Sequence, residues 1–538
     1  MKRRDFLKTG VKIGIAANAL PMLLNGSPVR ALGRSPLRKV LEASGTSNNN
    51  VLVIIQLQGG NDGLNCVIPY TDPLYASLRP TLKLDPTTVL KLNGNSTLAL
   101  HPNMIGMNNL FTNGKLAILQ NVGYPSSSLS HFRGTDIWNT ATDSSIYSST
   151  GWVGRLLLEQ NPGYPPSSIP TGSQPLAIQF GNSLSNLFLA QTGGMGIAIS
   201  RVPTVSNTSS HNYDPIPSSP TTPYKELQYV RIIQSETEIY SQTIANRKVT
   251  TNKATYPSGN LALQLSSVAQ MIASGFQTKI YMVTQGSYDT HSGQLTGQGT
   301  LLGDLSAAVA AFQQDIEAFG VADQVAMMTY SEFGRRPQEN GSGTDHGTAA
   351  PLFVMGTQVK GAVYGNDPSL KPADLVSNNL KYDPLHDFRN IYATVMNEWL
   401  LSGGDQTQVN NDIKSVLTSD ASGTYSKTSA WQSLGIFKAS QQGYVASNPD
   451  AAGLMLMQNY PNPSRATTTI EFALPAPGAV ELGVFNTAGV EVARIADGRM
   501  EEGIHREEFD ASRLPNGAYF YRLRTDAGEV TRQMIVEH

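Results

Sequence analysis

The sequence has almost no cysteine: Cys66 is the single one among 538 residues. One cysteine cannot form a disulfide within the chain, and it excludes a multi-cysteine zinc or iron–sulfur site. Charge is scarce as well, since charged residues make up 15% of the chain and its formal net charge is −2. A near-neutral chain lacks the basic surface that binds a phosphate backbone, so we expect no nucleic-acid partner.

Long hydrophobic runs are also missing. Residues 11–24 form a modest apolar run that polar residues and a proline interrupt, so we expect no transmembrane segment. The pair Arg3-Arg4 precedes this run, and small residues follow it at Val29-Arg30-Ala31. Residues 1–31 therefore resemble a twin-arginine signal peptide, with an ordinary Sec signal as the alternative. The resemblance implies twin-arginine export machinery as a partner and passage through the periplasm.

Continuous apolar runs are spread over the central region. Residues 51–57 are apolar and β-branched, as expected of a strand that is buried on both faces of a parallel sheet. Similar runs lie at 116–122, 176–180, 280–283, 325–330 and 352–355, and residues 299–319 place apolar residues on one helical face. This alternation predicts an α/β fold with helices on both sides of a central sheet.

Polar segments with acidic and imidazole side chains stand next to several of these expected strands. Carboxylate oxygens and imidazole nitrogens are ordinary ligands of divalent cations. Sites in this fold class form beyond the carboxyl ends of strands, so we expect the segments to meet at one edge of the sheet. The candidate metal ligands are Asp62, His131, Asp289, His291, Asp345 and His346.

Three of these segments leave alternatives open. Asp62 lies in the Gly-Gly-Asn-Asp-Gly sequence of residues 59–63, which is also typical of a plain Asx turn. Ser130 opens a helix where a nucleophile or an anion clamp could lie, although serines that only cap helices are common. His386 could complete a ligand set, but it precedes a helix, and we expect a surface cap there.

A second unit follows a polar stretch, residues 403–452, which has the Ser-, Gln-, Asn- and Gly-rich composition of a linker. Short alternating runs separated by turn residues then predict an Ig-like antiparallel β-sandwich, with strands at 467–474, 479–485, 490–495, 505–509, 518–523 and 529–536. Together with Asn459-Tyr460-Pro461-Asn462-Pro463, residues 453–538 resemble the type A sorting domain of the type IX (Por) secretion system. This implies type IX secretion machinery as a partner and a cell-surface or extracellular location. An adhesive or carbohydrate-binding module is the alternative.

Motifs in the central region resemble the family called domain of unknown function 1501 (DUF1501). They run in order from residue 50 to residue 402 and include Ser-His-Phe-Arg-Gly-Thr-Asp-Ile-Trp, Tyr-Asp-Thr-His, Ser-Glu-Phe-Gly-Arg-Arg and Asp-His-Gly-Thr-Ala-Ala-Pro. The family is similar in outline to the alkaline phosphatase and sulfatase superfamily. Over residues 32–402 the resemblance implies an alkaline-phosphatase-like central sheet, one or two divalent cations at strand ends and a nucleophile at a helix start.

The resemblance carries over to the metal ligands only in part. It puts Asp62 at the superfamily's first metal carboxylate and His346 at its last metal histidine, while Asp289 and His291 replace a more widely spaced pair. Glu332-Phe333 stands where the superfamily has Asp-His. Because phenylalanine cannot bind a metal, the second cation site is lost or is rebuilt with Asp345 or His131. The expected cofactor is a divalent metal, with zinc as the favoured ion.

Catalytic roles follow from the same resemblance. Ser130 is the expected nucleophile, with Ser128 and Thr135 as competitors, and Glu332 binds metal or acts as a base. The ester's anionic oxygens would be neutralised by Arg133, Arg335 or Arg336. The expected function is a secreted, metal-dependent hydrolase of a small phosphate or sulfate ester. The alternatives are a non-catalytic metal-binding surface protein on the same scaffold and a purely structural surface protein.

Overall fold

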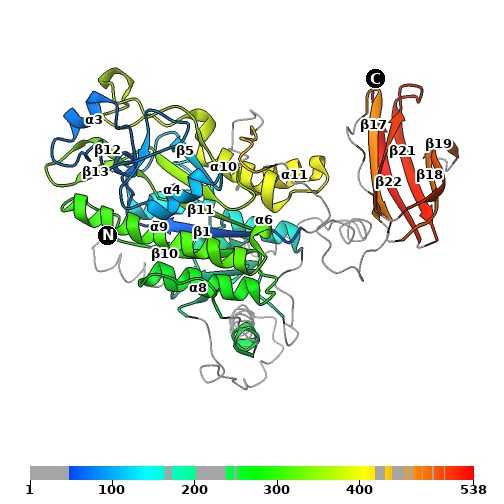
Figure 1. Cartoon of the computed structure of the whole chain (residues 1–538), viewed down its shortest axis with the longest axis horizontal. Coiled ribbons are helices and arrows are strands. Elements are labelled where there is room, and N and C mark those ends of the chain that lie inside the picture. Colours follow the sequence, from blue (N-terminus) through cyan, green and yellow to red (C-terminus); the bar gives the residue numbers. More distant parts are fainter. Residues whose placement is uncertain are drawn as a thin grey trace, which may run out of the picture. The chain divides into compact units, whose positions relative to one another are not determined.

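The chain divides into two compact units, Met1–Ser440 and Gln441–His538 (Figure 1). The computed structural model describes residues 48–162, 164, 173–201, 238–246, 251–417 and 431–438 of the first, and 455–456, 459, 464–474, 476–486, 490–501, 503–526 and 528–538 of the second. The expected signal peptide, residues 1–31, lies outside the described residues. No helix within the described ranges is long and apolar enough to cross a membrane.

An eight-stranded mixed sheet forms the centre of the first unit, in the order β15-β5-β14-β11-β1-β10-β6-β9. Strand β1 (Val51–Leu57) lies between β10 (Ile280–Gln285) and β11 (Val325–Tyr330) and pairs in parallel with both. Beyond β10 the parallel pairing continues through β6 (Ala177–Phe180) and β9 (Ile197–Ile199). Strand β14 (Ala350–Met355) is antiparallel to both β11 and β5 (Leu116–Val122), and β15 (Ala362–Tyr364) is parallel to β5. The predicted α/β class and its buried strands are confirmed.

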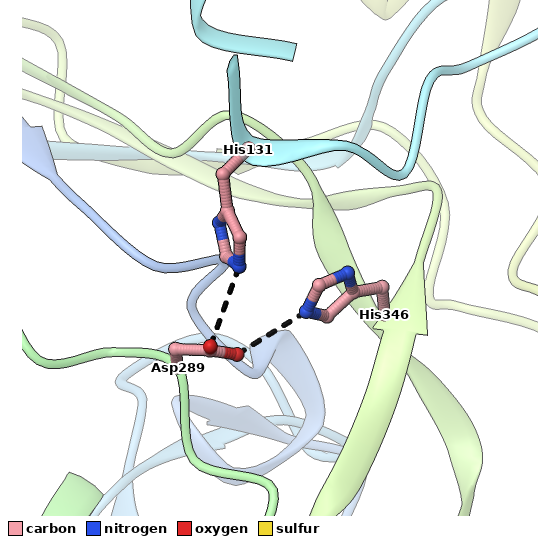
Figure 2. A group of neighbouring side chains, drawn as sticks. All are labelled: His131, Asp289 and His346. Carbon is pink, nitrogen blue, oxygen red and sulfur yellow. Dashed lines mark hydrogen bonds and ion pairs between the residues drawn. The ribbon is translucent and has the colours of Figure 1, made fainter. Parts of the chain in front are cut away.

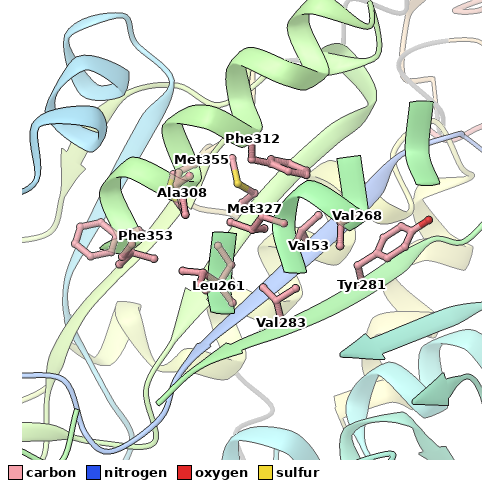
Figure 3. Packing of buried hydrophobic residues seen from close by; sticks show 14 of the residues in the cluster. Val53, Leu261, Val268, Tyr281, Val283, Ala308, Phe312, Met327, Phe353 and Met355 are labelled. Atoms are coloured by element: carbon pink, nitrogen blue, oxygen red, sulfur yellow. The ribbon is translucent and has the colours of Figure 1, made fainter. Parts of the chain in front are cut away.

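Helices cover both faces of this sheet because alternate residues of each buried strand point to opposite sides. Val53 and Ile55 of β1 pack into one hydrophobic cluster with α4 (Ile105–Thr112), α8 (Asn260–Ala273) and α9 (Gln294–Ala318). Figure 3 shows this side, with Val53 and Met327 of the sheet close to Phe312 of α9. Leu52 and Ile54 pack into a second cluster with α5 (His131–Thr140), α6 (Trp152–Gln160), α10 (Phe388–Val395) and α11 (Gln406–Leu417).

One edge of the sheet receives most of the polar segments. Strands β1, β10 and β11 run parallel, and β5 runs the same way because two antiparallel pairings separate it from β11. The carboxyl ends of these four strands therefore open at one edge, where the antiparallel β14 begins. The hairpin of β12 (Gly334–Glu339) and β13 (Thr344–Gly347) joins β11 to β14 at this edge.

Short elements complete the first unit. The small sheet β2-β4-β3 and the pair β7-β8 stand apart from the central sheet. The bounds of these strands are β2 (Val67–Ile68), β3 (Leu90–Lys91), β4 (Ala99–Leu100), β7 (Leu189–Ala190) and β8 (Gly193–Gly194). Further short elements of this unit are the α-helix α3 (Pro73–Leu78), the 3₁₀ helices η1 (Gly63–Asn65), η2 (Asn186–Phe188), η4 (Ala322–Gln324), η5 (Pro372–Asp374) and η6 (Pro384–His386) and the π-helix η7 (Met396–Leu400).

The first unit continues beyond residue 402, into the stretch whose composition suggests a linker. Helix α11 buries Val409, Ile413 and Val416. Residues 431–438, which we call the clasp, pack on the same unit: Phe437 stacks on Trp399 with ring centroids 5.1 Å apart. Buried apolar side chains, rather than polar composition, therefore place these segments in the first unit. Residues 418–430 and 439–452 lie outside the described residues.

The second unit is an antiparallel β-sandwich, as predicted. One sheet is β16 (Met455–Leu456), β17 (Thr467–Leu474) and β20 (Gly503–Asp510). The other is β19 (Glu491–Met500), β18 (Gly478–Asn486), β21 (Gly517–Thr525) and β22 (Gly528–Val536). Ile470 and Phe472 of the first sheet share a core with Leu482 and Tyr521 of the second.

Candidate metal centre

Two histidines and one aspartate converge at the edge of the central sheet. Ligand-type atoms of His131, Asp289 and His346 all lie within 4.8 Å of one another. Nε2 of His131 is 3.4 Å from Oδ2 of Asp289, and Nε2 of His346 is 3.2 Å from Oδ1 of the same carboxylate. Figure 2 shows the imidazole of His131, on α5, and that of His346, on β13, both pointing at this carboxylate. We call these three residues the His–Asp–His cluster.

Each member comes from a different connection at the edge where the strands end. His131 is the first residue of α5, which follows β5, and His346 lies on β13 opposite Arg335. Asp289 follows β10 through a turn in which Ser287 has a positive φ of 76°. The loop after β1 closely approaches the backbone of Asp289. This requires glycine at position 59, because its φ is +126° and a Cβ there would lie 2.4 Å from the Asp289 backbone nitrogen.

Hydrogen bonds on the far side of both imidazoles fix which nitrogen faces the cluster. Nδ1 of His346 is 2.8 Å from the carbonyl oxygen of Leu129, and Nδ1 of His131 is 2.8 Å from Oε1 of Glu332. Carbonyl and carboxylate oxygens only accept hydrogen bonds, so each Nδ1 carries the proton. Nε2 is then the nitrogen that faces Asp289 and is left for a cation, as in metal-binding histidines that donate their other N–H.

The carboxylate between them is ionised. Burial opposes ionisation of Asp289, but hydrogen bonds from Arg335 and His346 and the charge of Arg335 outweigh it and lower the pKa of Asp289 to about 2. Nη2 of Arg335 donates to Oδ1 over 2.7 Å. The cluster therefore combines one ionised carboxylate with two imidazoles whose Nε2 atoms face it.

His291 and Asp345 lie on the open side of the cluster. Nε2 of His291 is 3.0 Å from Nε2 of His346 and 3.1 Å from Oδ1 of Asp289. Its Nδ1 faces Oδ1 of Asp345 at 3.6 Å, and the His291 side chain is 45% exposed. A third imidazole thus lies on the solvent side of the cluster.

Phe333 closes the inner side. Its ring centroid is 4.9 Å from that of His131 and 4.4 Å from that of His346. Gly60, with φ of +78°, makes room for it, because a Cβ there would lie 2.3 Å from the phenylalanine ring. Phe333 thus gives the cluster a buried apolar wall on this side.

The structure does not bring Asp62 into the cluster, although sequence reasoning made it a metal ligand. Asp62 is fully buried and forms an ion pair with Arg79, whose Nη2 donates to Oδ1 over 2.9 Å. Oδ2 also accepts from Nε2 of Gln294. Both oxygens are therefore already used by neighbouring donors.

The arginines expected to hold the substrate's charge are engaged elsewhere. Arg133 pairs with Asp136 and donates to the carbonyl oxygens of Ser144 and Ile146. Arg335 is fully buried and donates to the carbonyls of Gly59, Gly60 and Thr344 as well as to Asp289. Neither guanidinium is open to a ligand.

Three further expectations have definite places in the fold. Ser130 is exposed and occupies the N-cap position of α5, but its side chain makes no capping hydrogen bond. His386 is buried, not at the surface as expected, with Nδ1 2.6 Å from the carbonyl oxygen of Gln120. Arg336 has a buried Nε without a partner in the described part of the chain.

Sequence reasoning missed the groups that orient the two cluster histidines. It gave Glu332 a role as a ligand or base, whereas the carboxylate lies behind His131. It gave no role to Leu129, because a backbone carbonyl leaves no sequence signal. The only hint was proximity, since Leu129 and His131 flank the same helix start.

Two family models match the chain. The one described as "Protein of unknown function (DUF1501)" matches residues 268–414, and the "Secretion system C-terminal sorting domain" matches residues 458–537. The chain thus carries one segment similar to the DUF1501 family and another similar to the secretion sorting domain. The DUF1501 segment contains Asp289 and His346, whereas His131 lies before it. The sorting domain indicates export to the cell surface or the extracellular space, with type IX secretion machinery as partner.

Several solved structures match the chain at low sequence identity. An alkaline phosphatase superfamily protein from Vibrio parahaemolyticus is 11% identical, with 64% of this chain and 71% of that one covered at a TM-score of 0.28. The lipoteichoic acid synthase LtaP from Listeria monocytogenes is 10% identical, with 60% and 67% covered at 0.27. The PsFucS1 sulfatase from Pseudoalteromonas sp. is 10% identical, with 92% and 91% covered at 0.28. No curated protein matches this chain.

Proposed function

We propose that this protein is a secreted, metal-dependent hydrolase of phosphate or sulfate esters. One divalent cation, zinc in the first instance, would be bound by Nε2 of His131, Nε2 of His346 and the carboxylate of Asp289. The observation that carries the proposal is the convergence of two imidazoles, each with Nδ1 hydrogen-bonded away, on one ionised carboxylate.

The donor set suits such an ion. Two imidazole nitrogens and a carboxylate oxygen are a common ligand set of catalytic zinc, which keeps one position open for water or substrate. The side chains of Asp289 and His291 are 46% and 45% exposed, so the cluster is open on one side. A bound divalent cation supplies Lewis acidity, which polarises an ester oxygen and lowers the pKa of a hydroxyl or water.

The start of α5 supplies the other chemical groups. Ser130 stands between Leu129, whose carbonyl accepts from His346, and His131, so its hydroxyl belongs to the segment that borders the cluster. The uncapped N-terminus of this helix favours an anionic group through its N–H groups and its dipole. Because Arg133 and Arg335 are engaged, the ester's charge would face this helix end.

The test is metal analysis combined with turnover. Protein purified from its native export route should contain about one zinc per chain, the number expected for a single His–Asp–His site. Asp289→Ala and His346→Ala should lose that metal, whereas His505→Ala, in the second unit, should retain it. Wild-type protein should hydrolyse aryl phosphates or aryl sulfates, and the two cluster variants should not.

A non-catalytic metal-binding surface protein is the second candidate. It is favoured by the absence, among the described residues, of a histidine or carboxylate that accepts a hydrogen bond from the Ser130 hydroxyl, and by the engagement of both arginines. Bound metal without turnover on phosphate and sulfate monoesters and diesters would select this candidate. Absence of bound metal from the wild-type protein would rule out both.

A further inference from the structure

Glu332 is a buried carboxylate that directly backs the His–Asp–His cluster. Its side chain has no exposed surface and lies two residues beyond β11. Oε1 accepts from Nδ1 of His131 over 2.8 Å and from the backbone N–H of Gly59 over 2.9 Å. Oε2 is buried without a hydrogen-bond partner in the described part of the chain. A fold that retains such an unpaired oxygen calls for an explanation in function.

The backbone around Glu332 is held on both sides. The Ser331 hydroxyl donates to the Leu57 carbonyl over 2.7 Å and accepts from the Asn61 N–H over 2.8 Å. On the side of α5, Gly134 packs so closely that a Cβ there would lie 3.0 Å from the Glu332 carbonyl oxygen. The carboxylate is therefore fixed between the loop after β1 and the first turn of α5.

The two cluster histidines obtain their orientation in different ways. His346 is held by a backbone carbonyl, that of Leu129, which no substitution removes. His131 is held by a side chain, and only its Nδ1-protonated tautomer leaves the Nε2 lone pair facing Asp289. The ring of Phe333 limits the tilt of the imidazole from the other side.

We propose that Glu332 is a positioning residue that fixes the tautomer and ring orientation of His131 and does not itself bind the cation. This inference rests on the proposed metal site, and it gives Glu332 a role distinct from ligand or general base. Removing the hydrogen-bond partner of a metal-bound histidine typically weakens metal binding about 10–100-fold.

The experiment measures cation affinity rather than hydrolysis. Zinc is titrated against a competing chelator, and the visible spectrum of the cobalt-loaded protein reports ligand geometry. Glu332→Ala should bind zinc about 10–100-fold more weakly and shift the cobalt spectrum. Glu332→Gln keeps an acceptor for His131 and Gly59, so it should recover most of the affinity and a wild-type-like spectrum.

The decisive control repeats Glu332→Ala in a His131→Ala background, with zinc titrated to concentrations high enough to measure the weaker binding that the two remaining ligands allow. If Glu332 acts through His131, the second substitution should weaken zinc binding no further. Equal weakening in both backgrounds, or unchanged affinity in Glu332→Ala, would overturn the inference while leaving the metal site intact. A wild-type protein that binds neither zinc nor cobalt would overturn the proposed function and this inference together. Should the alanine variant fail to fold, Glu332→Asp replaces it, because the shorter side chain withdraws the acceptor but keeps the charge.

Discussion

Arg335 and Asp289 form an ion pair in which the guanidinium is fully buried and the carboxylate is 46% exposed. The same guanidinium donates to the carbonyl oxygens of Gly59 and Gly60 over 2.6 and 2.7 Å and to that of Thr344 over 2.7 Å. One side chain thus ties the loop after β1 and the β12–β13 hairpin to the carboxylate of the cluster. Arg335 therefore holds these segments together from the buried side of the cluster and has no exposed surface of its own.

Arg335→Ala should destabilise the first unit and loosen the cluster. It leaves three buried carbonyls without their donor, and a hydrogen bond to a charged group contributes about 1.5–3 kcal/mol, so we expect a loss of about 3 kcal/mol or more. Urea unfolding measures this loss. The neighbouring Arg336→Ala is the matched control and should have a much smaller effect; equal effects would contradict the role given to Arg335.

Asp62→Asn should affect stability but not metal content. Asp62 and Arg79 are both fully buried, and removing one partner of a buried pair costs about 3–5 kcal/mol. Because the cluster does not include Asp62, the number of zinc ions per chain should stay unchanged in the folded variant. Elemental analysis and urea unfolding of the same preparation test this. Loss of metal at unchanged stability would restore Asp62 as a ligand.

His101 should make the first unit sensitive to mild acid. Burial lowers the pKa of His101 to about 4 from its usual value of 6.5, because the charged form is desolvated. The unfolded chain therefore binds a proton that the folded one does not, so stability is complete above pH 6.5 and falls as the pH drops from 6.5 towards 4. The full loss is about 3 kcal/mol, at about 1.4 kcal/mol per pKa unit.

His101→Asn tests this pH dependence, because it keeps an acceptor for the Asn103 N–H, which lies 3.1 Å from Nδ1 in the wild type. Unfolding free energies measured in chelator from pH 7 to pH 4 should fall less steeply in the variant. Parallel curves for the two proteins would contradict the assignment.

Metal removal should act on one unit alone. If the first unit binds zinc and its unfolded form does not, free zinc at 100 times its Kd stabilises the folded unit by about 2.7 kcal/mol. Calorimetry with and without chelator should therefore shift the transition of the first unit and leave that of the β-sandwich in place. His346→Ala should show no chelator-dependent shift. A shift in both transitions would point to an effect of the chelator unrelated to the cluster.

The strands and the meeting of His131, Asp289 and His346 at one edge could be predicted from sequence. Continuous β-branched runs mark strands buried on both faces, and parallel strands must open at the same edge. That Asp62 lies outside the cluster could not be predicted. Its partner Arg79 is 17 residues later in the sequence, and only the packing of the chain brings the two side chains together. The same holds for Arg133 and Arg335, whose charges are satisfied by backbone carbonyls that leave no pattern in the sequence.

The end of the first unit was predictable in part. Val409, Ile413 and Val416 follow the spacing of an amphipathic helix, a signal that outweighs the polar composition around it. The clasp carries no such periodicity. Its attachment depends on Glu398, which accepts from the backbone N–H groups of Gly435 and Phe437 over 2.8 and 2.9 Å.

The clasp has a consequence for a protein that carries a sorting domain. Ile436 and Phe437 of the clasp are buried, so they cover apolar surface of the first unit and lie before its last residue, Ser440. A proteolytic cut beyond residue 440 would therefore leave the clasp attached to the first unit. A cut before Trp431 would instead remove Ile436 and Phe437 and expose the apolar surface that they cover.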